Sequence, residues 1–354
     1  MTPRERVKAA LGCQPTDRTP WVELANHPPV VEAILGRSLP AQITNHSFPD
    51  QKRFEEYLRC LTEFSEKLGI DAVLLKFWTP AFAETRQAGT KTCVRTGLIR
   101  DEDSLKKYGG QLPEPVVPGT VDYDSAVTYN RIFSGGNLAR GFQIGGIYGF
   151  AEVSVGYEEM CLAFYDRPEW LKRVIAVGAE HVIETARRLL DLAELDFLIL
   201  NDDLAFKTGP LISPAIFREF FLEHFARLGN VLKKRNVPFV CHTDGDFTPL
   251  LEMFLEAGIQ AIHPCEPAAM DIFALKDAYG DRLCLMGNLD VDLLVRGTPQ
   301  QVREQGKSLL QGMGDKNGHI FSSGNCIMPE TPLENIQAMA EAHRLYAARK
   351  SPAR

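Results

Sequence analysis

Eight short apolar runs, each followed by a stretch with helical spacing, constrain the fold of this chain more than any other feature of its sequence. The runs are centred near residues 21, 72, 142, 197, 238, 261, 283 and 319. Apolar runs of this length indicate buried strands, and their alternation with helices indicates a parallel sheet. Eight such units predict an α/β fold, a (β/α)8 barrel of the TIM type.

A doubly wound sheet is the main alternative, because it is built from the same alternating units. Its dinucleotide-binding form carries a G-x-G-x-x-G fingerprint at the first turn after a strand. The glycine-rich segment of this chain, residues 145–149, reads Gly-Gly-Ile-Tyr-Gly and does not fit that pattern. The barrel is therefore the favoured fold.

A single barrel domain is expected to span residues 1–354, with two additions to the basic pattern. Residues 1–19 are expected to form an N-terminal helix and lead-in, with Thr2 as the cap and Pro3 in the first turn. Residues 84–140 are expected to be an insertion after the second strand. Alternation in its first part predicts an antiparallel excursion, and residues 101–140 show no clear period.

Composition and charge exclude several classes of protein. The net charge is −7 with Lys and Arg scattered, which argues against nucleic-acid binding. We find no apolar run of 18 residues and no apolar signal core, so we expect a cytoplasmic protein that does not enter a membrane. The eight cysteines include no C-x-x-C pair, which argues against a disulfide scaffold or a zinc ribbon.

Polar residues at the carboxyl ends of the predicted strands are the candidates for function, because TIM-type barrels place their active sites on that face. Adjacent acids at 202 and 203 are explained equally well by a solvated turn, and packing is the default explanation for the aromatic residues. The catalytic candidates are Glu152, Asp202 and Asp203, and the substrate-binding candidates are Trp78, Tyr148, Asn201 and Asn288.

A metal site is predicted where the fifth strand ends, in the segment Cys-His-Thr-Asp-Gly-Asp at 241–246. His242 and Asp244 are spaced to converge on one ion, and Asp246 is better placed than Asp244 to cap the next helix. Cys326, in a Gly-Asn-Cys-Ile-Met-Pro context, is the best functional thiol. Histidine, carboxylate and thiol ligands together suit zinc.

His263 and Cys265 share the same spacing as His242 and Asp244 and form a second candidate set. For His263, a core histidine that donates to a backbone carbonyl is the favoured interpretation, because such residues are usually satisfied in this way. For Cys265, a packed thiol is favoured. Whether either residue belongs to the site is left open by the sequence.

Several longer stretches resemble the uroporphyrinogen decarboxylase superfamily, which includes corrinoid-dependent methyltransferases. The resemblance covers most of the chain and is clearest from about residue 195 to 345; it implies a distorted (β/α)8 barrel. It is carried by "NDDLAFKTGPLISPAIFREF" at 201–220, "VCHTDGD" at 240–246, "YGDRLCLMGNLDVDLL" at 279–294, "GTPQQVRE" at 297–304 and "PLENI" at 332–336.

The decarboxylase branch carries arginines after strand one and an aspartate after strand two, both of which hold the tetrapyrrole. The corresponding stretches here are "PWVELANHPPVVEAILGR" and "LLKFWTP", which lack those arginines and that aspartate. A tetrapyrrole with many carboxylates needs cationic partners. This departure argues against uroporphyrinogen as the substrate.

The methyltransferase branch uses a zinc site of the form His-x-Cys with a distant Cys. His242 matches its histidine, Asp244 replaces its first cysteine, and Cys326 matches its second. Replacing a thiolate by a carboxylate makes the ion a stronger Lewis acid, which suits a methoxy oxygen as well as a thiol.

The resemblance therefore implies transfer of a methyl group between a small methoxy compound or thiol and a corrinoid protein, assisted by zinc. The chain has no Asp-x-His-x-x-Gly motif, so the corrinoid is expected on a separate partner protein. A homodimer is compatible with this expectation. One alternative is a decarboxylase or lyase that acts on a small carboxylate or a tetrapyrrole-like substrate. A non-catalytic corrinoid- or tetrapyrrole-binding protein is the other.

Overall fold

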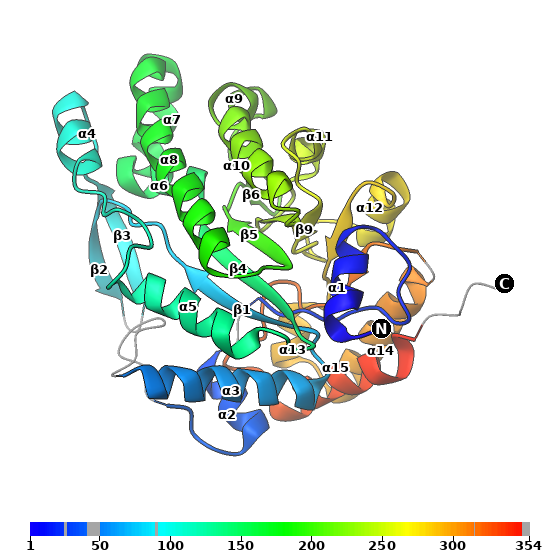
Figure 1. Ribbon diagram of the computed structural model, residues 1–354. Helices are drawn as coiled ribbons and strands as arrows, with labels where there is room; N and C mark the ends of the chain where they lie inside the picture. Colours follow the sequence, from blue (N-terminus) through cyan, green and yellow to red (C-terminus); the bar gives the residue numbers. More distant parts are fainter. Residues whose placement is uncertain (25–26, 41–49, 89–90, 315, 349–354) are drawn as a thin grey trace.

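A parallel sheet of seven strands forms the centre of the computed structural model, which describes residues 1–24, 27–40, 50–88, 91–314 and 316–348 (Figure 1). Neighbouring strands pair in parallel in the order β1-β4-β5-β8-β9-β10-β11. The strands are β1 Ala72–Phe77, β4 Ala139–Gly145, β5 Phe197–Asn201, β8 Phe239–His242, β9 Ala261–His263, β10 Cys284–Met286 and β11 His319–Ile320.

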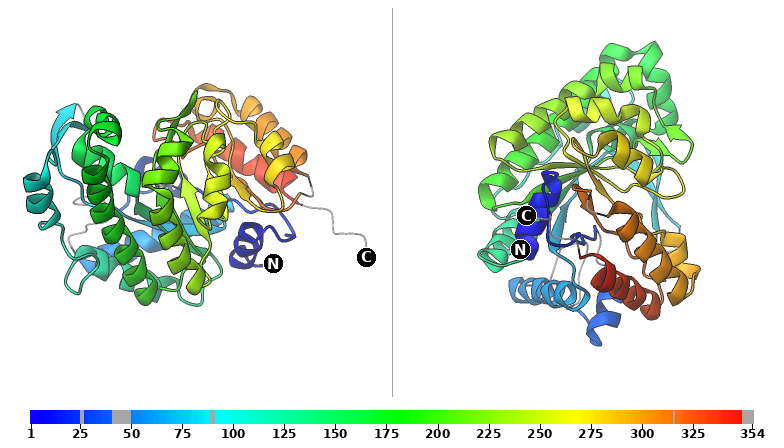
Figure 2. Two further views of the ribbon diagram at one scale, coloured as in Figure 1. Left: turned by 90° about the horizontal axis from the view of Figure 1, so that it is seen from above. Right: turned by 90° about the vertical axis from the view of Figure 1, so that its right-hand side faces the viewer.

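Helices surround the sheet and cover its outer face (Figures 1 and 2). The longest, α8, has a continuous buried stripe that includes Val174, Val182 and Leu189, the pattern of an amphipathic helix on a sheet. The helices are α1 Pro3–Leu11, α2 Pro28–Leu35, α3 Gln51–Leu68, α4 Glu102–Gly109, α5 Val121–Phe133, α6 Ile147–Val155, α7 Tyr157–Asp166, α8 Pro168–Leu192, α9 Pro214–Phe220, α10 Leu222–Lys234, α11 Leu251–Glu256, α12 Ile272–Tyr279, α13 Val291–Arg296, α14 Pro299–Met313 and α15 Leu333–Tyr346.

The first of the eight expected strands, at residues 20–24, is not a regular strand. Trp21 forms only an isolated parallel bridge with Phe321. The segment nevertheless lies between the two edges of the sheet: Val22 N donates to Phe321 O at 3.0 Å, and Asp71 N donates to Trp21 O at 2.7 Å. Pro20 has no N–H to donate, which shortens the ladder. The arrangement is consistent with a TIM-type barrel in which this segment bridges β11 and β1.

Glu23 links residues 20–24, which we call the bridging segment, to the end of β11 through hydrogen bonds. Its Oε1 accepts hydrogen bonds from Trp21 Nε1 at 2.7 Å and from Ser323 N at 2.9 Å, and its Oε2 accepts from Ser323 Oγ at 2.6 Å. The side chain is buried. Burial raises the pKa of Glu23 to about 7, although the three hydrogen bonds lower it.

Folding stability is expected to fall as the pH rises from 5 to 7, because Glu23 binds a proton in the native state at pH values where the unfolded chain has lost it. Each pH unit in this window should cost about 1.4 kcal/mol from this group. Glu23→Gln keeps a neutral side chain of the same shape, so it should remove this part of the slope. Urea unfolding at pH 5 and pH 7 measures the difference. The exposed Glu56→Gln should leave the slope as in the wild type, and an unchanged slope in Glu23→Gln would contradict the assignment.

The interior of the sheet is filled by a separate apolar cluster, which α1 closes at one end. Val7, Ala10 and Leu11 of α1 belong to this cluster. Helix α1 begins as expected, with a capping box from Thr2 and with Pro3 in its first turn. Val22 and Leu24 of the segment 20–24 also belong to it, and its strand residues are Ala72, Leu74, Ala139, Phe197, Ile199, Val240, Ala261, Cys284, Met286 and Ile320.

The expected excursion after the second predicted strand is present as a hairpin of β2 Ala83–Ala88 and β3 Lys91–Gly97, paired antiparallel. The absence of a helical period in residues 101–140 was misleading, because α4 and α5 lie there. Asp101 and Thr120 cap these helices. The buried face of α5 includes Ser125 and Thr128, and such small polar residues hide the period. The hairpin and α4 lie at the end of the molecule away from both termini (Figures 1 and 2).

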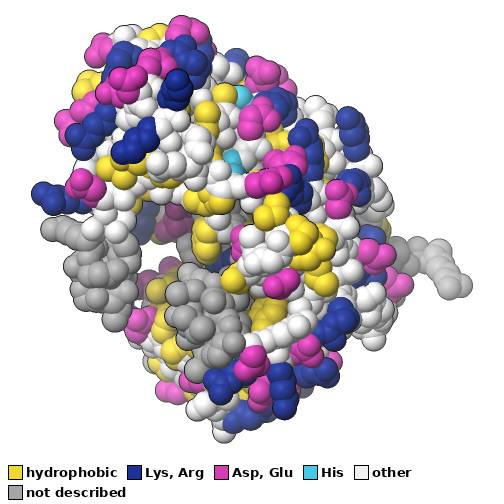
Figure 3. Space-filling model, turned by 60° about the vertical axis from the view of Figure 1, so that its left-hand side comes forward, with side chains coloured by type: hydrophobic (Ala, Val, Ile, Leu, Met, Phe, Trp, Pro, Cys, Tyr) yellow, Lys and Arg dark blue, Asp and Glu magenta, His cyan; other side chains and the backbone are white. Residues whose placement is uncertain are grey.

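Two further features concern the surface. On the face shown in Figure 3, Lys and Arg side chains are interspersed with Asp and Glu side chains, and hydrophobic side chains border a hollow. Among the described residues, no helix combines the length and the apolar character that a membrane crossing requires.

Candidate functional site

A layer of polar side chains lies directly above the inner apolar cluster, toward the carboxyl ends of the strands. Side chains on one face of a strand recur every second residue. Two positions beyond the cluster residues Leu74, Ile199, Val240 and Ala261, the chain therefore changes from apolar to polar on the same face. The residues of this polar layer are Lys76 on β1, Gln143 on β4, Asn201 on β5, His242 on β8 and His263 on β9.

Two histidines form the centre of the polar layer. Nδ1 of His242 lies 2.8 Å from Nδ1 of His263, and the two rings stack with centroids 5.1 Å apart. Burial lowers the pKa of His242 to about 3, and burial followed by the charge of His242 lowers that of His263. Both rings are therefore neutral at pH 7, and one N–H is shared between them. The backbone carbonyl partner expected for His263 was wrong; its partner is His242.

Two carboxylates face the other nitrogen of His242. Its Nε2 lies 3.8 Å from Asp203 Oδ1 and 3.9 Å from Asp244 Oδ1. The three candidate ligand atoms all lie within 4.8 Å of one another. Nδ2 of Asn325 donates to Oδ1 of Asp244 at 2.8 Å and to its Oδ2 at 3.1 Å, which holds that carboxylate in place. Asp246 caps the following turn as expected, because its Oδ1 accepts from Thr248 N.

Electrostatics at this group favour a bound cation. Burial, and then the charges of Asp203 and Glu266, raise the pKa of Asp244 to about 6. Burial also raises the pKa of Asp203. Two carboxylates that disfavour each other's charge are relieved by a positive ion between them. We call Asp203, His242 and Asp244 the acidic triad.

The acidic triad fits a divalent metal ion. In a tetrahedral zinc site with bonds near 2.1 Å, ligand atoms lie about 3.4 Å apart, about 0.4–0.5 Å closer than His242 Nε2 is to either carboxylate here. Small side-chain rotations cover that difference. The contact with His263 also fits, because a metal-binding histidine usually donates its second N–H to a neighbouring group.

Cys326 lies outside the acidic triad. Its Sγ is 3.5 Å from His27 Nε2 and 3.7 Å from Met328 Sδ. Burial raises the pKa of the Cys326 thiol to about 11, so it carries its proton at neutral pH. The structure therefore brings together two of the three expected ligands, His242 and Asp244, and adds Asp203 to them.

The two adjacent aspartates point to different places. The buried carboxylate of Asp202 accepts hydrogen bonds from Ile147 N, Tyr148 N and Gly149 N at 2.7–2.8 Å, so it caps the start of α6. Asp203 instead faces His242, with 58% of its side chain exposed. Asp202 thus stabilises the fold, whereas Asp203 lies at the mouth of the barrel, its open end at the carboxyl ends of the strands.

The remaining catalytic and substrate-binding candidates divide in the same way. Glu152 on α6 is half-buried, and burial followed by the charge of Asp203 raises its pKa. Trp78 is exposed at the mouth. Tyr148 is buried against Phe221, with ring centroids 5.5 Å apart, and does not face the mouth. Asn201 belongs to the polar layer and accepts a hydrogen bond from Gln143.

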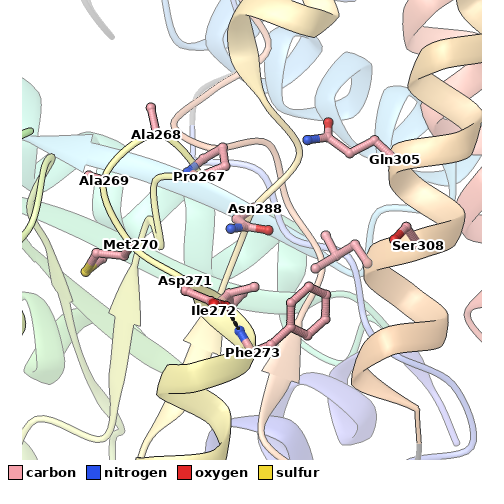
Figure 4. A pocket seen from close by; sticks show the side chains of 11 residues that line it. Pro267, Ala268, Ala269, Met270, Asp271, Ile272, Phe273, Asn288, Gln305 and Ser308 are labelled. Atoms are coloured by element: carbon pink, nitrogen blue, oxygen red, sulfur yellow. Dashed lines mark hydrogen bonds between the residues drawn. The ribbon is translucent and has the colours of Figure 1, made fainter.

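Two cavities lie near these groups. The larger, of about 1040 Å³, opens beside the acidic triad and is lined by residues that include Asp244, Asn325, Glu266 and Lys207. The smaller, of about 450 Å³, is lined by Asn288 and by residues of α12 and α14. Figure 4 shows Gln305 extending from α14 toward Asn288. Pro267 and Ala268 line both cavities, so Asn288 is a neighbour of the mouth and does not line it.

Comparison with known proteins assigns the family. The family model described as "Uroporphyrinogen decarboxylase (URO-D)" matches residues 143–346, which run from β4 to the end of α15. The chain belongs to the uroporphyrinogen decarboxylase family. The resemblance inferred from the strand ends and from the 201–220 and 279–294 segments is thereby confirmed.

Relatives and a solved structure agree with this assignment. A uroporphyrinogen decarboxylase of Dechloromonas aromatica is 29% identical over 196 residues, which cover 54% of this chain and 53% of that protein. One from Coxiella burnetii is 30% identical over 138 residues, 38% of this chain and 37% of that protein. The matches thus span about half the length of these curated relatives, or less. A methyltransferase from Methanosarcina mazei shares the fold, with a TM-score of 0.74, 20% identity and coverage of 98% and 99% of the two chains.

Proposed function

We propose that this chain is a methyltransferase that moves a methyl group between a small methoxy compound or thiol and a corrinoid protein. The observation that carries the proposal is the acidic triad, in which His242 Nε2 faces Asp203 and Asp244 at 3.8 and 3.9 Å. Its place at the carboxyl ends of β5 and β8 is the position of catalytic groups in TIM-type barrels.

Asp203, His242 and Asp244 would hold a divalent ion, for which zinc is our choice, and Asp203 is favoured over Cys326 as the third ligand. When bound, the ion supplies a Lewis acid that polarises the oxygen or sulfur carrying the methyl group. The residues behind the triad keep it in position: His263 fixes the ring of His242, and Asn325 fixes the carboxylate of Asp244.

Proton transfer falls to Glu152 in this proposal. Burial and the charge of Asp203 raise its pKa, which favours the protonated form, and the departing oxygen or sulfur needs a proton when the methyl group leaves. The cavity of about 1040 Å³ leaves room for a small substrate and for the approach of a corrinoid on a second protein. The methyltransferase of Methanosarcina mazei shows that a chain of this fold carries methyltransferase activity.

Decarboxylation is the second candidate, and the names of the curated relatives favour it. The cations that line the mouth cavity argue against uroporphyrinogen itself. Lys207 lies 4.0 Å from Glu266, and Arg296 is paired with Asp292, so both of these described cations already face an acid. A substrate with many carboxylates would have to compete with those pairs.

Two measurements on the purified chain test the proposal. Metal content is measured after preparation without chelators and again after zinc is added, and we expect about one zinc per chain. Methylation of added cob(I)alamin is then followed with a panel of methoxy compounds and methyl thioethers, with uroporphyrinogen consumption measured in parallel. A chain that binds no metal and converts uroporphyrinogen would overturn the proposal in favour of the decarboxylase.

A further inference from the structure

Lys76 is a cation inside the barrel that has no anionic partner among the residues that the structure describes. It stands on β1 two residues beyond Leu74, so its side chain enters the polar layer from the face that the inner apolar cluster occupies. Among the described residues, its ammonium makes no hydrogen bond and no ion pair; its one recorded contact is the ring of Trp78, 5.8 Å from Nζ to the centroid. Its side chain is half-buried, and a charge that is partly removed from water without a partner is costly, which makes its retention informative.

His263 offers a second unsatisfied group in the same layer. For His242 to bind a metal through Nε2, its Nδ1 must carry the proton and donate to Nδ1 of His263. The proton of His263 is then on Nε2, and this atom is fully buried with no acceptor among the described residues. A buried N–H without a partner costs about 1–3 kcal/mol unless a ligand accepts from it.

The two groups belong to the same polar layer and come from opposite walls of the barrel. In the strand order, with the bridging segment counted between β11 and β1, strand β9 stands across the barrel from β1. Burial, then His242 and then Lys76 lower the pKa of His263, in keeping with an ammonium inside the same barrel. Burial, followed by Lys76, does the same at His242.

We propose that Lys76 and the Nε2–H of His263 form an anion subsite that holds the carboxylate of the substrate. This deepens the proposed function and rests on it for the role of the methyl group: the substrate class is a small carboxylic acid that also carries a methoxy or methylthio group. The carboxylate accepts from the ammonium and from the imidazole N–H, and both bonds are charge-assisted. The methyl-bearing atom then faces the acidic triad on the other side of His242.

The position of Trp78 is consistent with this class. Its ring is exposed at the mouth beside Lys76 and offers a flat apolar wall to the part of the substrate between the two polar ends. A cationic substrate does not suit the subsite, because the ammonium would repel it. The ammonium of Lys76 would repel a metal ion as well. The anion subsite and the acidic triad therefore accept opposite charges.

Binding of two carboxylates, each compared with its neutral amide, tests the subsite without knowledge of the natural substrate. Isothermal titration calorimetry is run with benzoate against benzamide and with acetate against acetamide, on the full chain with and without zinc. We expect the wild type to prefer the carboxylate by at least about tenfold, and Lys76→Met to lose that preference. Lys76→Arg should keep most of it. Lys233→Met, which removes an exposed lysine of α10, is the matched control and should bind as the wild type does.

Folding is checked independently of binding. Lys76→Met should be at least as stable as the wild type, because it removes an unpaired, half-buried charge, and benzoate should raise the thermal midpoint of the wild type but not that of the variant. Equal binding of acid and amide by the wild type, or a preference that survives in Lys76→Met, would overturn the subsite.

The outcome for the subsite is separable from the outcome for the proposed function. Methyl transfer from 4-methoxybenzoate to cob(I)alamin is compared with transfer from 4-methoxybenzamide. A carboxylate preference in binding with no methyl transfer from any donor would keep the subsite and overturn the methyltransferase. Methyl transfer that ignores the charge of the donor, in the wild type and in Lys76→Met alike, would keep the methyltransferase and overturn the subsite.

Discussion

Asp203→Asn is expected to weaken zinc binding by at least about 100-fold, whereas Cys326→Ser should change it by less than about threefold. The expected loss is large because removal of a group that merely supports a ligand already costs about 10–100-fold in metal affinity. The two residues compete for one role: the sequence pattern matches Cys326 to a zinc ligand, and the structure places Asp203 beside His242 instead.

The measurement is competition of each variant against a chromogenic zinc chelator at pH 7.5, followed by the rate of cob(I)alamin methylation. His242→Ala marks full loss of the site and should abolish both signals. Asn325→Ala should give an intermediate result, because Asp244 would lose the amide that holds it. A larger loss in Cys326→Ser than in Asp203→Asn would show that the loop after β11 rearranges to bring the thiol to the metal.

The fold was largely predictable because its signal is repeated and local. Each apolar run that becomes a strand is short and bounded, and seven of the eight predicted strands are present in the predicted order. The segment at Trp21 departs because Pro20 cannot donate to the ladder, although the segment still lies where the eighth strand was expected. Helix α5 was missed because its buried face carries hydroxyl-bearing and small residues, which conceal the helical period.

The sequence predicted which residues lie at the ends of the strands, but not which of their side chains point toward the site. Adjacent residues at the end of a strand point to opposite faces, so Asp202 and Asp203 could not both reach the mouth. Which of them does so depends on where α6 begins, since its first N–H groups bind Asp202. The direction of the Cys326 side chain likewise depends on the loop in which it lies. Its thiol contacts His27, which is distant in sequence, and Met328, which lies in the same irregular loop.

The position of Lys76 on the inner face of β1 could have been predicted from the sequence pattern. The pattern Ala-x-Leu-x-Lys from Ala72 has period two, and it ends in a charge on the face that is otherwise apolar. The same pattern, Val-x-His, occurs at Val240, where it was recognised because histidine is a familiar metal ligand. A search for any polar residue that continues the inner face of a strand finds both.

Asp202→Ala is expected to destabilise the chain by about 3–5 kcal/mol, one of the largest effects available outside the apolar core. Three backbone N–H groups at the start of α6 would lose a shared acceptor, and each buried N–H left without a partner costs about 1–3 kcal/mol. The space beside the carboxylate is also closed: a Cβ on Gly146 would lie 2.2 Å from Asp202 Oδ1, so the backbone approaches this side chain closely.

Thermal unfolding at pH 5 measures the effect, because burial raises the pKa of Asp202 to about 7 and the contribution of this group to stability is lost as the pH rises through that value. At about 2 °C per kcal/mol for a chain of this size, the midpoint should fall by about 6–10 °C. With a metal chelator present for all proteins, Asp203→Ala is the matched control, since it removes the same group one residue later from a largely exposed position, and its midpoint should stay within about 2 °C of the wild type. If both variants shifted alike, the cap would not be the source of the stability; if Asp202→Ala stayed folded but lost substrate turnover alone, Asp202 would belong to the catalytic groups after all.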